Sequence, residues 1–108
     1  MSLILPIDDN GNPISVLGYE YRGTQRVAVT AISARNAAAV PSYIDVVTIV
    51  ATSFCHFEVG DSTVTADRNA SPILFPGQYL DIPLRPGERF VAFVADTDPC
   101  DAYLIARI

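Results

Sequence analysis

This sequence contains few charged residues, and fewer basic ones than acidic ones. Lysine and tryptophan are absent, and histidine occurs only at position 56. Charged residues make up 18% of the 108 positions, against the usual share of about a quarter. Twelve acidic and seven basic residues give a net charge of −5. Because a nucleic-acid-binding protein needs a basic face, we expect no nucleic-acid partner.

Long apolar stretches are also absent. No run approaches the roughly 20 residues that span a bilayer. Residues 1–6, MSLILP, lack the basic start and cleavage site of a secretory signal. We therefore expect no membrane partner and synthesis in the cytoplasm. Half of the residues are hydrophobic, which excludes disorder, and the length suits one domain with one modest core.

A single histidine restricts catalysis and metal binding. Nucleophilic catalysis by a serine or cysteine would have to use His56, which falls within an apolar strand pattern, and no GxSxG motif is present. Metal sites of the cupin type need two or three histidines with a carboxylate, whereas here only Glu58 accompanies His56. Asp96, Asp98 and Asp101 resemble the start of a calcium loop but lack its glycine and terminal glutamate, which favours an acidic turn. We expect no enzyme activity, no metal and no cofactor.

The two cysteines, Cys55 and Cys100, lack the CxxC spacing of a zinc site. A reducing cytosol favours two buried thiols. A disulfide stays open as an alternative, because it requires Cα atoms about 4.4–6.8 Å apart, which sequence spacing does not reveal.

Turn-forming residues divide the chain into short segments. Eight prolines and six glycines exclude long helices, and the segments between them are rich in Val, Ile, Phe and Tyr, the composition of strands. Residues 34–40, with three consecutive alanines, are too short for a helix and predict a loop or a single turn. This spacing predicts an all-β sandwich, barrel or jelly roll. The predicted strands are 25–33, 43–52, 55–59, 62–66, 78–84, 88–95 and 102–108, with a short one at 14–17.

The domain organisation that we predict is an N-terminal arm over residues 1–13 followed by a β-sandwich domain over 14–108. The arm begins with the apolar residues 3–7 and then becomes acidic. Such a segment either docks on a neighbouring chain as an added strand or frays as a free terminus.

Three predicted strands are apolar on both faces, namely 90–95, 44–51 and 102–108. A two-layer sandwich buries only the faces between its sheets, so the second faces need cover from loops, from a barrel interior or from other subunits. We favour other subunits. The apolar candidates for such an interface are Val46, Ile49, Phe90, Phe93, Tyr103 and Ile105.

The order of the segments over residues 26–108 resembles the small β-sandwich virion proteins of tailed bacteriophages, of the head-decoration or cement type and of the fibre base. The segments that carry the resemblance are TAISA at 30–34, VVTIV at 46–50, VGDSTVTA at 59–66, SPILFPG at 71–77, LRPGERFVAFVA at 84–95 and the closing strand at 101–108.

The resemblance implies a single jelly-roll-like β-sandwich of about seven to eight short antiparallel strands, without catalytic residues. It implies a homo-oligomer, with a trimer favoured, that sits in the virion and braces the capsid. Its partners would be its own copies and the major capsid protein or another virion protein, after synthesis in the host cytoplasm. Arg89 and Arg107 would then pair with carboxylates to fix the register of the interface. The alternative is a β-sandwich binding module, for a receptor or a carbohydrate, on a phage tail or another assembly.

Overall fold

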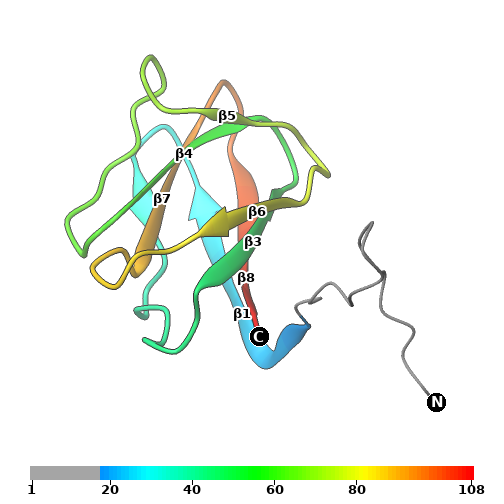
Figure 1. The fold of residues 1–108 in the computed structure, drawn as a ribbon. Coiled ribbons are helices and arrows are strands. Elements are labelled where there is room, and N and C mark those ends of the chain that lie inside the picture. The colour runs from blue at the N-terminus through cyan, green and yellow to red at the C-terminus, as the bar shows by residue number, and fades with distance from the viewer. Residues whose placement is uncertain (1–17) are drawn as a thin grey trace, which may run out of the picture.

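Eight β-strands and their connections make up the described part of the chain, residues 18–108 of a computed structural model (Figure 1). Within these residues there is no helix, and therefore none that could cross a membrane. The predicted arm 1–13 and the predicted short strand 14–17 lie outside the described residues. The strands are β1 Tyr19–Val29, β2 Ala34–Arg35, β3 Val46–Ala51, β4 Cys55–Gly60, β5 Ile73–Leu74, β6 Leu80–Pro83, β7 Phe90–Ala95 and β8 Cys100–Arg107.

The strands form two four-stranded sheets with the orders β1-β8-β3-β6 and β2-β7-β4-β5. Antiparallel ladders join β1 to β8, β2 to β7, β3 to β6 and β4 to β5, so the chain resembles one long hairpin whose two arms pair from end to end. The long hairpin folds over on itself, and two further ladders, β3 with β8 and β4 with β7, join its strand pairs into the two sheets. This is the strand order of a jelly roll, and it confirms the all-β sandwich prediction.

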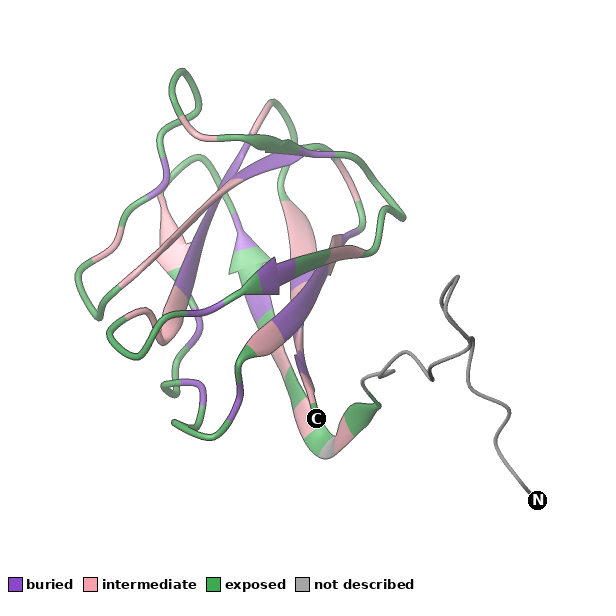
Figure 2. Ribbon diagram, in the orientation of Figure 1, coloured by how far each residue is buried: buried purple, intermediate pink, exposed green. Residues whose placement is uncertain are grey.

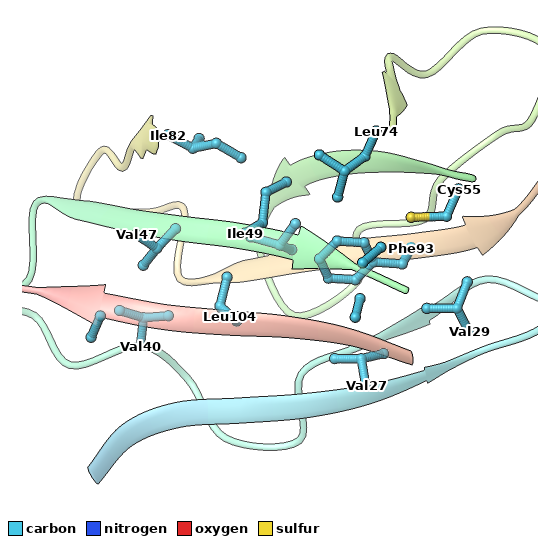
Figure 3. Close-up of a cluster of buried hydrophobic side chains, with 14 of the residues drawn as sticks. Val27, Val29, Val40, Val47, Ile49, Cys55, Leu74, Ile82, Phe93 and Leu104 are labelled. Carbon is cyan, nitrogen blue, oxygen red and sulfur yellow. The ribbon is translucent and has the colours of Figure 1, made fainter. Parts of the chain in front are cut away.

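The core lies between the two sheets and is built from alternate residues of each strand. Ile49 on β3, Leu104 on β8 and Phe93 on β7 are almost completely buried and meet in the centre (Figure 3). The period of two in a strand directs every second side chain to one face, so these positions share the inner layer. The other members of this cluster include Val27, Val29, Val47, Leu74, Ile82 and Val91.

The second face of β7 is covered by the chain's own loop. Ala92 and Val94, which point away from the main core, pack against Ala66 and Val64 in the connection between β4 and β5. Most of β7 is consequently buried (Figure 2). This connection approaches the sheet so closely that a Cβ atom on Gly60 would lie 2.8 Å from Val64. Of the three explanations for a doubly apolar strand, loop cover is therefore the one that applies to β7.

Three local predictions were wrong. Residues 62–66 form no strand, because the Asp61 side chain accepts hydrogen bonds from the Thr63 amide (2.9 Å) and hydroxyl (2.6 Å) and bends the chain. The segment predicted as a loop or turn at 34–40 contains β2, which pairs with β7. Strand β1 begins before residue 25, and its register shifts between Tyr19 and Thr24, where Arg22 has a φ of 60°. Such irregularities depend on the partner strand and leave little trace in the pattern of apolar residues.

Substitution of Ile49 by valine tests the inner layer. We expect Ile49→Val to lower the free energy of unfolding by about 0.5–1.5 kcal/mol, because it removes one methylene from a fully packed position. The matched control is Ile32→Val, at a position that is 80% exposed, and we expect a change of less than about 0.5 kcal/mol. Urea denaturation measures both, and equal costs at the two positions would contradict the assignment of the core.

Candidate functional site: an open sheet face

The outer face of the β1-β8-β3-β6 sheet, which we call the open face, is the candidate site. Apart from Thr48, which is buried, its residues are all partly or fully exposed. They are the side chains that alternate with the inner layer, namely Thr24, Arg26, Ala28, Val46, Thr48, Val50, Asp81, Pro83, Asp101, Tyr103, Ile105 and Arg107.

The middle of the open face is apolar. Val50 on β3 lies directly opposite Tyr103 on β8, while Ile105 lies opposite Thr48 and is diagonal to both Val50 and Val46. The side chains of Val46, Val50, Tyr103 and Ile105 are all half-buried. Directly opposed residues in an antiparallel pair lie about 4.5–5.5 Å apart and diagonal ones about 7–8 Å, so the four make an apolar strip beside Thr48.

Arg107 organises one end of this strip. Its guanidinium donates hydrogen bonds to the Thr48 hydroxyl (3.0 Å) and the Asp81 carboxylate (3.1 Å), and Nε donates to the Gly18 carbonyl (3.1 Å). The same group lies 4.4 Å from the centre of the Tyr19 ring. Thr48 in turn donates to Asp81, so a buried hydroxyl on an outer face is satisfied. The side chain of Arg107 is only 15% exposed, and its planar, multiply bonded head is fixed against the sheet.

A second ion pair borders the strip on the side of β1. Arg26 donates to Asp101 through both Nε (3.0 Å) and Nη2 (2.8 Å). The Arg26 side chain is 63% exposed, and we expect the pair to contribute little to stability. The open face thus combines an apolar centre with opposite charges at its margins.

The predicted interface residues separate into three groups. Val46, Tyr103, Ile105 and Arg107 share the open face. Ile49 and Phe93 point into the core and have no surface to offer a partner, because their positions in the alternation face the other sheet.

Arg89 and Phe90 lie away from the open face, at the start of β7. Arg89 donates to the carbonyls of Pro41 (2.9 Å), Ile44 (2.6 Å) and Arg85 (2.8 Å), so its head holds two turns together within the chain. Phe90 is half-buried.

Sequence reasoning missed several members of the open face. Thr48 is the one polar residue in the apolar stretch 46–51 and indicates which face of the strand meets water. Because side chains alternate, this could have assigned Val46 and Val50 to the outer face and Ile49 to the core. Asp81 alternates with Leu80 and Ile82 and carries the same signal. For β7 no such signal exists, since every residue is apolar.

The acidic turn residues face different partners. Asp96 binds His56 and Asp101 binds Arg26, and among residues 18–108 no group of three histidine, cysteine or acidic side chains is placed to hold a metal ion.

Near the start of β1 a cavity of about 260 Å³ has an apolar floor that includes Val47 and Leu104, with Glu20 and Arg22 among the polar residues that line it.

His56, on β4, is hydrogen-bonded to the connection between β4 and β5 that covers β7. Its side chain is almost entirely buried, with Nε2 2.9 Å from the Asp96 carboxylate and Nδ1 2.9 Å from the Ser71 carbonyl. Both partners are acceptors, so the ring satisfies both only when it is protonated. Burial lowers the pKa of His56, but the hydrogen bonds to Asp96 and Ser71 outweigh burial, and the net pKa is raised above its ordinary value.

Comparisons with protein-family models, curated proteins and solved structures found no match.

Substitution of Arg107 by lysine tests the network at the edge of the open face. We expect Arg107→Lys to lower the free energy of unfolding by about 1–3 kcal/mol, because an ammonium group cannot reproduce the planar set of donors. Arg26→Lys, on the same face but largely exposed, is the matched control and should change little. Chemical denaturation measures both, and a neutral Arg107→Lys would show that the network adds no stability.

The raised pKa of His56 predicts a pH-dependent stability. A group whose pKa is higher in the folded state stabilises fully below its unfolded value, here 6.5, and loses this contribution as the pH rises through the folded pKa. We expect the difference in unfolding free energy between the wild type and His56→Gln to shrink from pH values below 6.5 to values well above it. Denaturation curves across this range give the difference, and a difference that stays constant with pH would contradict the doubly bonded imidazolium.

Proposed function

We propose that this protein is a non-enzymatic structural protein of a tailed-phage particle, an oligomeric decoration or cement protein that braces the capsid. The observation that carries the proposal is the open face, where Val46, Val50, Tyr103 and Ile105 form an apolar strip between two arginine–carboxylate pairs. Of the interface residues predicted from the sequence, Val46 lies on this face with Tyr103, Ile105 and Arg107, which are at least 57 positions away in the chain.

The chemistry of the open face suits a contact between copies of the chain. An interface typically has an apolar centre with aromatic and arginine residues and a polar rim. Tyr103 and Arg107 supply the aromatic and arginine residues of such a centre. Arg26, Asp101 and Asp81 supply the polar rim. In a closed ring of three copies, each strip would be removed from water and the charged margins would set the register.

The second contact in this proposal joins the oligomer to the major capsid protein or another virion protein. Many copies on a regular lattice bind strongly together even when each contact is weak. The net charge of −5 keeps free copies soluble and apart before assembly in the host cytoplasm.

The alternative function is a binding module for a receptor or a carbohydrate. The cavity of about 260 Å³ beside β1 supports it, because an apolar floor with Glu20 and Arg22 in the lining can hold one small group of a ligand. The backbone of Arg22 has a φ of 60°, a conformation that non-glycine residues rarely adopt. A module of this kind needs no second copy, so the mass in solution separates the two functions.

Light scattering on fresh protein at several concentrations tests the proposal. We expect a trimer of about 35 kDa, three times the chain mass of 11.6 kDa. Ile105→Glu places a charge in the apolar strip and should reduce the mass to that of the monomer, since an unpaired buried charge is costly at an interface.

The matched control is Ile32→Glu, which changes an exposed isoleucine away from the open face and should leave the oligomer intact. Thermal unfolding of both variants verifies that they are folded. A wild-type mass of 11.6 kDa at every concentration would contradict the trimer and favour the binding module.

A further inference from the structure

The two connections at one end of the sandwich run side by side. Residues 52–54 join β3 to β4, and residues 96–99 join β7 to β8, so both cross from one sheet to the other. The amide of Thr52 donates to the Asp101 carbonyl (2.9 Å), and the Asp101 amide donates to the Thr52 hydroxyl (3.0 Å). The Asp96 amide also bonds to the Phe54 carbonyl (3.3 Å). These bonds hold the beginnings of β4 and β8 in fixed positions relative to each other.

Each of these strands begins with a cysteine. Cys55 starts β4 in one sheet, and Cys100 starts β8 in the other. Cys55 belongs to the central core, where Figure 3 shows its sulfur, and Cys100 packs against that core with its sulfur 3.9 Å from the Ser53 carbonyl. Both cysteines are free thiols. Two residues that lie 45 positions apart in the chain are thus brought to one hydrophobic cluster between the sheets.

We propose that Cys55 and Cys100 are a redox pair, which forms a disulfide between the two sheets when the protein meets an oxidised low-molecular-weight thiol such as glutathione disulfide. The proposal rests on the position of both cysteines in one cluster between the sheets and on the hydrogen-bonded connections beside them. It does not depend on the proposed function, because it concerns the fold of the single chain.

The difference in burial gives the two cysteines different roles. Cys100 is half-buried and Cys55 is inaccessible to solvent, so the Cys100 thiolate reacts first. It attacks one sulfur of glutathione disulfide and releases one glutathione thiolate, leaving a mixed disulfide on Cys100. The Cys55 sulfur then attacks the Cys100 sulfur, and the second glutathione leaves with the proton that Cys55 gives up. Two thiols are oxidised and one glutathione disulfide is reduced to two thiols, so the two electrons balance.

The second step is the slow one in the folded protein. Burial, together with the neighbouring Cys100, raises the pKa of the Cys55 thiol to about 12, so the thiolate is scarce near neutral pH. Oxidation of the folded chain is consequently slow near neutral pH. Once formed, the bond closes a long loop and restricts the unfolded chain.

The test is to incubate the purified full chain with glutathione disulfide or with dithiothreitol and to measure its intact mass. We expect the oxidised sample to lose two hydrogen atoms without retaining glutathione, and its thiol count in denaturant to fall from two to zero. Its melting temperature should rise by roughly 10 °C or more relative to the reduced sample.

Single variants separate the two roles. Cys55→Ala should leave Cys100 able to carry one glutathione, whereas Cys100→Ser should carry none while it is folded, because Cys55 is buried. Retention of glutathione on both cysteines of the wild type, disulfides only between chains, or an oxidised form that melts no higher than the reduced one would overturn the proposal.

Discussion

The packing of β3 and β8 against β7 is the contact on which the rest of the structure depends. Ile49 and Leu104 from one sheet meet Phe93 from the other, and all three are almost completely removed from water. Because side chains alternate along a strand, fixing these residues inward also fixes their neighbours outward. The open face and the covered outer face of β7 are both consequences of this one layer.

The two outer faces are treated differently. On β7 the outward residues Ala92 and Val94 are small, and the loop that contains Val64 and Ala66 lies on them. On β3 and β8 the outward residues are larger and remain in contact with solvent between two ion pairs. The molecule therefore has one side covered by its own loop and one side with an apolar strip in contact with solvent.

With so few charged residues, the arginines that are present hold particular parts of the fold. Arg89 binds three carbonyl groups and joins two turns, and Arg107 links β8 to β3, β6 and the start of β1. Asn36 acts in a similar way, since its side chain accepts from the Val91 amide and donates to the Arg89 carbonyl. Polar groups that are taken out of water must find partners, and here these partners connect segments far apart in the chain.

The amino-acid sequence by itself determined the fold class, the absence of long helices and most of the longer strands. Proline, glycine and β-branched residues restrict the backbone locally, and these effects are visible in any short stretch. The same logic reached Val46, Tyr103 and Ile105 but also selected Ile49 and Phe93, because an apolar side chain looks the same at a core position and at an exposed one. Two-residue strands such as β2 and β5 carry too little pattern to be recognised.

Only the tertiary structure decided which face each residue of β7 occupies, which loop covers that strand and that Cys55 and Cys100 lie in one cluster. Each of these depends on contacts between segments that are distant in sequence. The alternation of side chains along a strand shows which residues share a face. The residues that cover that face come from another part of the chain. That is the physical reason why the strands could be predicted from the sequence, whereas which outer face is covered and which stays open could not.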